Sequence, residues 1–302
     1  MQRFPARFIL VLAVMVLAGC SAPAGSIFAP GAKLETLSTN FKFAEGPASD
    51  AEGNVYFTDQ PNDRIMKWTV DGKFETFMQP CGRSNGLCVD GGGNLVSCAD
   101  EKNQLWLIDV KTKAVTVLVK DYQGKLLNGP NDVWVRPDGG MYFTDPFYPR
   151  DYWKRGPQEQ DGHHVYFLSA DYKTLTRVTT DLTQPNGIIG TPDGKTLYVS
   201  DIDAKKTYSY RINDDGTLAG KKLFCEAGSD GMTIDDEGDV YVTNAEGVTV
   251  FDKTGKQIES IKIDQPWTGN ICFGGKDRRT LFVTASTGVY AMKMRVSGVG
   301  SQ

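Results

Sequence analysis

The chain has 302 residues, of which 40% are hydrophobic and 23% charged, a balance that is ordinary for a folded globular protein and excludes a disordered one. Its 33 basic and 37 acidic residues give a net charge of −4, and no basic run of nucleic-acid-binding length occurs, so DNA and RNA are excluded as expected partners. The length fits two average domains, or one large all-β domain.

The first twenty residues form a targeting segment. Arg3 and Arg7 precede ten apolar residues at 8–17, too few to span a bilayer, and Leu-Ala-Gly-Cys ends the run at Cys20. This ending resembles a bacterial lipobox, which predicts a signal peptide over 1–19, a lipidated Cys20 and a tether over 20–31. The alternative is an ordinary cleaved signal peptide with an accidental cysteine. We expect a periplasm-facing lipoprotein of the cell envelope, and Ser21 favours the outer membrane.

One sequence phrase recurs six times after the tether. Each copy is a turn followed by a short apolar run such as Val-Tyr-Phe-Thr-Asp, and the turn contains Gly in every copy except the last. The ends of successive copies are 41 to 56 residues apart. The final residues are Asp59, Asp100, Asp145, Asp201, Asn244 and Ala285. A period in the forties with alternating Val, Tyr, Phe and Thr between Asp-Gly turns predicts β-propeller blades and argues against a helical solenoid.

Each copy has one apolar run before it and two after it, which predicts an all-β, six-bladed propeller with four antiparallel strands per blade. The sixth unit ends near Arg295 after its third strand. We therefore predict that the N-terminal strand, residues 33–38, completes the last blade and closes the ring, which removes an open edge. The propeller is expected over 32–297, with a tail over 298–302.

The first residue of each innermost strand is expected to face the central channel. At this position the six units carry Glu45, Asn85, Asn131, Asn186, Asp230 and Asn270. Such a crowd of buried polar groups needs a counter-charge, and hard oxygen donors select calcium or magnesium. The alternative is that these are turn residues, because Asn-Gly and Asp-Gly begin strands in many proteins. Six polar residues at the same position of the repeat favour a metal site over this alternative.

The strand ends predict what surrounds this opening. Asp59, Asp145 and Asp201 end second strands and are expected near its rim. An insertion at 146–162 falls on the same face and carries four aromatic residues, including Tyr148, so we interpret it as a lid or pocket wall. The two histidines, His163 and His164, lie outside the six-fold set, and we expect a structural or exposed role for them.

Five cysteines follow Cys20, and we expect them to be buried free thiols. They are Cys81, Cys88, Cys98, Cys225 and Cys272. Because their number is odd, at least one cysteine is unpaired. The sequence contains no Cys-x-x-Cys pair that would indicate a zinc site.

Ordered phrases along the mature chain resemble the gluconolactonase family, which includes regucalcin. They include Phe-Ala-Glu-Gly-Pro at 43–47, Leu-Asn-Gly-Pro-Asn-Asp at 127–132, Gln-Pro-Asn-Gly at 184–187 and Ser-Asp-Gly-Met at 229–232. The resemblance implies a six-bladed propeller with one catalytic divalent cation held by Glu45, Asn186 and Asp230, with Asn131 close to metal and substrate. Gly129 departs from the regucalcin branch, which looks to carry a sugar-binding arginine there, and matches the bacterial gluconolactonase branch more closely.

The predicted reaction is therefore the hydrolysis of a small lactone or sugar-acid lactone by a calcium-dependent enzyme. The metal polarises the carbonyl, and Asp230, or else Glu45, acts as general base. Asn85, Asn131, Asp132, Asp145 and Tyr148 are expected to contact the substrate. Magnesium, manganese or zinc are expected as substitutes for calcium, and a monomer or dimer is expected. Two alternatives stay open: phosphotriester hydrolysis, and a non-catalytic propeller that binds a sugar or a partner.

Overall fold

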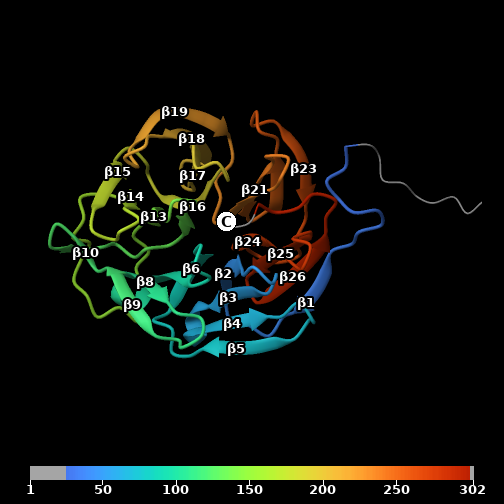
Figure 1. Cartoon of the computed structure of the whole chain (residues 1–302), viewed down its shortest axis with the longest axis horizontal. Coiled ribbons are helices and arrows are strands. Elements are labelled where there is room, and N and C mark those ends of the chain that lie inside the picture. The colour runs from blue at the N-terminus through green and yellow to red at the C-terminus, as the bar shows by residue number, and fades with distance from the viewer. Residues whose placement is uncertain (1–24, 300–302) are drawn as a thin grey trace, which may run out of the picture.

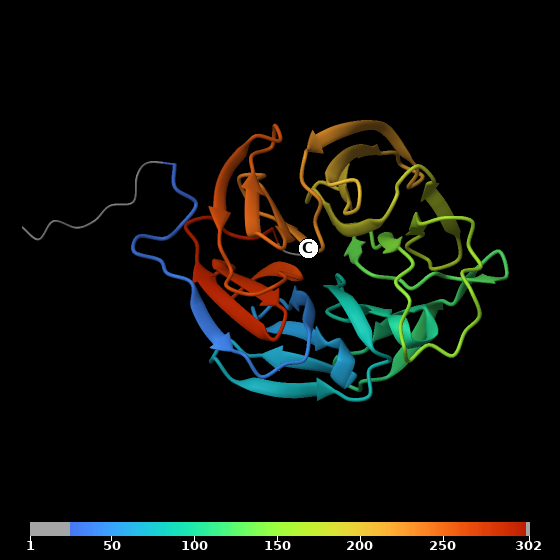
Figure 2. The same ribbon diagram turned by 180° about the vertical axis from the view of Figure 1, so that it is seen from behind.

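Six four-stranded antiparallel sheets are arranged as a ring in the computed structural model, which describes residues 25–299 (Figure 1). The view from behind shows the same ring of blades (Figure 2). The predicted six-bladed β-propeller is confirmed. The predicted signal peptide and Cys20 lie outside the described residues. Within residues 25–299, no helix is long and apolar enough to cross a membrane.

The first three blades, each given from the axis outward, follow one another along the chain. Blade one is β2 (Ala44–Ser49), β3 (Val55–Asp59), β4 (Arg64–Trp68) and β5 (Phe74–Met78). Blade two is β6 (Ser84–Val89), β7 (Leu95–Ala99), β8 (Gln104–Ile108) and β9 (Val115–Val119). Blade three is β12 (Val133–Val135), β13 (Met141–Asp145), β14 (His164–Leu168) and β15 (Leu175–Thr179).

The last three blades continue in the same order. Blade four is β16 (Pro185–Gly190), β17 (Thr196–Asp201), β18 (Lys206–Ile212) and β19 (Leu218–Cys225). Blade five is β20 (Met232–Ile234), β21 (Val240–Asn244), β22 (Gly247–Phe251) and β23 (Gln257–Ile261). Blade six is β24 (Asn270–Gly274), β25 (Thr280–Ala285), β26 (Gly288–Lys293) and β1 (Glu35–Ser38). Outside the blades are the 3-10 helices η1 (Gln60–Asn62) and η2 (Asp100–Lys102), and a small hairpin of β10 (Asp121–Tyr122) and β11 (Lys125–Leu126).

The N-terminal strand closes the ring as predicted. β1 is the outermost strand of blade six and pairs antiparallel with β26, where Glu35 faces Ala291 and Thr36 faces Tyr290. The last three strands of the chain thus share a sheet with its first strand. Closure covers an edge of β26 that would otherwise be open to pairing with another chain.

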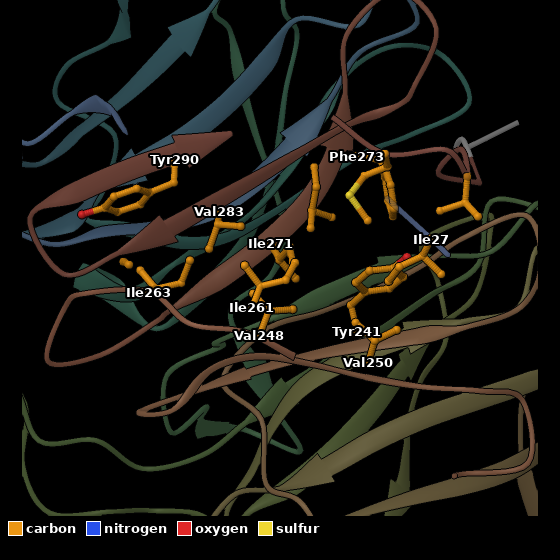
Figure 3. Packing of buried hydrophobic residues seen from close by; sticks show 14 residues of the cluster. Ile27, Tyr241, Val248, Val250, Ile261, Ile263, Ile271, Phe273, Val283 and Tyr290 are labelled. Atoms are coloured by element: carbon orange, nitrogen blue, oxygen red, sulfur yellow. The ribbon is translucent and has the colours of Figure 1, made fainter. Parts of the chain in front are cut away.

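The core lies between neighbouring blades. Second strands such as β3 and β13 are buried at every position, because a blade covers each of their faces, which explains their continuous apolar runs. Figure 3 shows one such cluster between blades five and six, in which the rings of Tyr241 and Phe273 meet edge-on with centroids 5.4 Å apart. Full burial of each such side chain stabilises the fold by about 1.5–3 kcal/mol.

The packed body is longer at both ends than the sequence predicts. Ile27, assigned above to the tether, is only 4% exposed and belongs to the cluster of blades five and six. Phe28 forms a β-bridge with Met294, and Gly298 forms one with Asp235. The reason is that Ile27 and its neighbours find an apolar surface on the ring, which composition alone does not reveal.

All cysteines of the described segment are free thiols, as predicted. Four are buried and Cys88 is half-buried. Burial raises the pKa of the Cys81 and Cys88 thiols to about 12, so these thiols are inert at neutral pH.

Candidate active site

Each of three innermost strands is placed by an aspartate from the second strand of its own blade. Asp201, at the end of β17, accepts hydrogen bonds from the Thr183 and Gln184 amides at 2.8 and 2.9 Å. Asp59 and Asp145 accept the equivalent pair of amides in blades one and three. All three aspartates are buried. Their carboxylates fix the backbone that leads to the axis.

Glycines next to the axial residues let neighbouring blades approach closely. Gly46 has a φ of +39°, and a Cβ there would lie 2.1 Å from the carbonyl oxygen of Asn85. A Cβ on Gly231 would lie 2.0 Å from Cγ of Asn270. The Gly86 amide donates to the Asn131 carbonyl oxygen at 2.8 Å. The Asn-Gly and Asp-Gly pairs therefore serve convergence on the axis.

A cavity of about 460 Å³ opens where the innermost strands begin. It is lined by Phe43, Glu45, Gln60, Asn85, Asn131, Tyr148, Arg150, Asn186, Ile202, Asp203, Asp230 and Trp267. Five of the six axial residues predicted from the repeat line it. The sixth, Asn270, lines a second cavity toward the other end of the channel, and its Oδ1 accepts the Ile271 amide at 2.7 Å.

Two buried carboxylates face each other in this cavity. Burial and then the negative charge of Asp230 raise the pKa of Glu45 well above its usual range, although Glu45 Oε2 accepts the Gly46 amide at 3.0 Å. Burial raises the pKa of Asp230 to about 6, against the effect of the Trp267 indole N–H, which donates to its Oδ2. Within residues 25–299 neither carboxylate forms a salt bridge, and the charge of Arg150 is only the last of the main influences on their pKa values, an arrangement that favours a bound cation.

Asn186 supplies an oxygen with no protein partner. Its Nδ2 donates to the Tyr148 hydroxyl at 3.1 Å. Its Oδ1 is buried and accepts no hydrogen bond within the described segment. A hard cation would satisfy this oxygen and the two carboxylates together. No group of three or more His, Cys, Asp or Glu side chains suited to a metal occurs within 25–299, so the fit depends on the amide oxygens.

Two residues expected to contact the substrate lie outside the cavity, which corrects that expectation. Asp132 accepts the Val133 and Ile188 amides at 3.0 and 3.3 Å, one on each oxygen, and faces the second cavity. Asp145 likewise has both oxygens occupied by backbone amides. Burial raises the pKa of each carboxyl to about 7. Both residues position the backbone beside the site.

The insertion between β13 and β14 forms one wall of the cavity, as predicted. It contributes Tyr148 and Arg150 to the lining. Arg150 was not predicted as a site residue. Its position among the aromatic residues of a long insertion is the sequence feature that could have indicated it. Trp267 was also missed, because it lies in the connection to blade six, outside the repeated phrases.

The histidines do not take part in the site. His164 is buried, and its Nε2 lies 2.9 Å from Asp161 Oδ1. Burial is the main reason that its pKa is lowered. His163 Nδ1 lies 2.7 Å from the Thr183 carbonyl oxygen. Neither residue lines the cavity, which agrees with the predicted structural role.

Known proteins resemble this chain in sequence and in architecture. The sequence profile of the SMP-30/Gluconolactonase/LRE-like region matches residues 43–287. A gluconolactonase of Zymomonas mobilis subsp. mobilis is 28% identical over 295 residues, covering 88% of this chain and 82% of the relative. A gluconolactonase structure from Xanthomonas campestris superposes with a TM-score of 0.83 at 28% identity, covering 89% of this chain and 91% of the other. The diisopropyl-fluorophosphatase of Loligo vulgaris is 28% identical over 280 residues, covering 80% of this chain and 85% of the relative.

Proposed function

Because the chain belongs to the SMP-30/gluconolactonase/LRE-like family, we propose that it is a lactonase that uses a divalent cation held at one end of its channel. The observation that carries the proposal is the buried Oδ1 of Asn186, which has no hydrogen-bond partner among residues 25–299 and lies in one cavity with the buried carboxylates of Glu45 and Asp230. The gluconolactonases described above support a lactone as the substrate.

Glu45, Asn186 and Asp230 would hold the cation, with Asn131 in the same cavity. Carboxylate and amide oxygens suit calcium, and magnesium, manganese or zinc are the proposed substitutes. A divalent cation at this place supplies a Lewis acid for the lactone carbonyl oxygen, on which negative charge develops during the reaction.

Asp230 is the proposed general base. Its carboxylate is oriented by the Trp267 indole and lies in the cavity, where it would accept a proton from the attacking water. The water oxygen bonds to the carbonyl carbon, the ring C–O bond breaks, and the ring oxygen takes up a proton, which yields the hydroxy acid. Glu45 is the alternative base. Asn85, Asn131 and Tyr148 would orient the substrate from the cavity wall.

The test is the hydrolysis of glucono-δ-lactone by purified residues 21–302, followed by acid release with calcium and with EDTA. We expect a calcium-dependent rate that Asp230→Asn lowers at least about a hundredfold, because loss of a general base alone removes 10²–10⁴-fold. Asp171→Asn is the matched control, since Asp171 is exposed and lies outside the cavity. A rate that EDTA leaves intact would contradict the metal, and a fully active Asp230→Asn would contradict the base.

Phosphotriester hydrolysis is a second candidate, favoured by the similarity to the diisopropyl-fluorophosphatase of Loligo vulgaris. The same cavity and the same oxygen donors would serve it. Diisopropyl fluorophosphate, whose P–F bond is hydrolysed, and a phosphotriester are tested beside the lactone in the same calcium and EDTA arms, which separates organophosphate hydrolysis from lactone hydrolysis. A metal-dependent rate on any of these substrates excludes a propeller that only binds.

We also propose the lipid anchor at Cys20 and a periplasm-facing place in the cell envelope, since the Leu-Ala-Gly-Cys ending resembles a lipobox. Fractionation of cells that express the full chain or Cys20→Ser tests this. We expect the full chain with the membranes and the variant in the soluble fraction, and equal partition of both would exclude the anchor.

A further inference from the structure

The wall made by the insertion is tied to one buried residue of blade two. Asp100 accepts Arg150 Nε at 3.2 Å and the Tyr152 hydroxyl on the same oxygen, Oδ2. Its backbone oxygen accepts the Trp153 indole N–H at 2.8 Å. Gln60, from the cavity lining, donates to the same Oδ2 at 3.4 Å. Asp100 is 3% exposed, so two insertion residues donate to a buried carboxylate and a third donates to the backbone of the same residue.

The carboxylate of Asp100 can bind the insertion because Asp100 does not have the role that the equivalent aspartates have in other blades. Asp59, Asp145 and Asp201 end the equivalent phrases and bind backbone amides of their own blade. In blade two this task belongs to Asp63, whose Oδ1 accepts the Cys81 and Arg83 amides at 3.0 and 2.7 Å. Asp63 reaches them from a left-handed conformation with φ +52° that ends η1. The carboxylate of Asp100 is thereby released for the insertion.

Arg150 lines the cavity and keeps donors that the protein does not use. Among residues 25–299, its hydrogen bond to Asp100 uses Nε, and no protein acceptor engages the two terminal nitrogens. The guanidinium carbon lies 5.6 Å from the centre of the Tyr148 ring, which supports one side of the group. Guanidinium carries four N–H donors on its terminal nitrogens in a planar fork. This fork lines the same cavity as Glu45 and Asp230.

We propose that Arg150 binds the hydroxyl oxygens carried by the lactone ring, and that Asp100 is the positioning residue that holds it. The proposal rests on the proposed function and adds a specificity subsite to it. The charge of Arg150 is balanced by Asp100 at 3.2 Å, so neutral hydroxyl groups, and not only anions, are suitable ligands. The subsite would favour polyhydroxylated lactones over unsubstituted ones, because only the former fill the fork.

The experiment compares glucono-δ-lactone with unsubstituted δ-valerolactone for the wild type, Arg150→Met, Arg150→Lys and Asp100→Asn. The readout is the ratio of kcat/KM for the two lactones. We expect Arg150→Met to lower this ratio at least about tenfold, mainly through KM for glucono-δ-lactone, because a hydrogen bond to a charged group is lost. Asp100→Asn should move the ratio in the same direction by less, and Arg150→Lys should restore part of it. Arg211→Met, an exposed arginine on β18, is the matched control.

Two results would overturn the subsite: equal losses on both lactones, or an unchanged ratio. A wild type that hydrolyses neither lactone contradicts the proposed function instead, and calorimetry with D-gluconate then tests the subsite without turnover. A tenfold weaker gluconate affinity in Arg150→Met supports the subsite. Equal affinity, or no binding by the wild type, overturns it.

Discussion

Gly269 limits how far the carboxylate of Glu45 can move, and its replacement by alanine tests how much the site depends on this. A Cβ on Gly269 would lie 2.5 Å from Glu45 Oε1 and 2.9 Å from its Cδ. The Gly269 backbone cannot retreat easily, because its amide donates to the Thr284 carbonyl oxygen at 2.9 Å and its own carbonyl accepts Thr243 Oγ1 at 2.8 Å. The carboxylate must therefore shift.

The size of the shift sets the expected effect. Moving from 2.5 Å to the shortest tolerated contact, 3.0 Å, displaces Oε1 by at least 0.5 Å. Functional groups need placement within about 0.5 Å, and an error of about 1 Å costs about a hundredfold in rate. We expect Gly269→Ala to lower kcat/KM for glucono-δ-lactone by about ten- to a hundredfold and to weaken calcium binding.

The assay follows acid release at saturating calcium, with calcium affinity measured by calorimetry. Gly156→Ala is the matched control, because a Cβ there meets no atom within 4 Å, although Gly156 also belongs to the insertion. Thermal melting verifies that both variants fold. If folded Gly269→Ala keeps both its kcat/KM and its calcium affinity within twofold, the placement of Glu45 does not govern the site and the reasoning is refuted.

Two further predictions concern groups that orient the site. Trp267→Phe removes the indole donor that lowers the pKa of Asp230, so the acidic limb of the pH–rate profile should move to higher pH by up to about one unit, with a loss of about tenfold in kcat. Trp106→Phe is the control, because the Trp106 indole donates to Gln104 at 2.8 Å outside the cavity. Identical pH–rate profiles for Trp267→Phe and the wild type would count against the prediction. Asp201→Ala leaves two amides of the chain leading into β16 without an acceptor, so the free energy of unfolding should fall by about 2–4 kcal/mol in guanidinium titrations. Exposed Asp214→Ala should leave it unchanged, and a common midpoint for both variants would show that the aspartate does not stabilise the blade.

The repeat explains why the axis could be predicted from the sequence. A residue's phase within the phrase transfers its place from blade to blade, and Glu45, Asn186 and Asp230 meet in one cavity for that reason. Phase does not reveal which groups a side chain at a strand end will bond. Asp145 was expected to face the substrate, but the backbone amides of Asn128 and Gly129 donate to its two oxygens.

The wall of the cavity could be located but not resolved from the sequence. Arg150 lines the site while it donates to Asp100, 50 residues earlier in the chain. Trp267 donates to Asp230 from the connection between β23 and β24, outside the repeated phrases. Both contacts depend on loop conformations, which no periodic pattern encodes.

The closure of the ring has a consequence for the order in which the protein can form during synthesis. Glu35 pairs with Ala291 in β26, so β1 has no strand partner until the 256 residues that follow Glu35, as far as Ala291, have left the ribosome. Blades one to five each contain four strands that are close in sequence, and local pairing of this kind needs little loop closure. Blade six has to wait for the opposite end of the chain, which makes its completion the step that locks the other five in a circle.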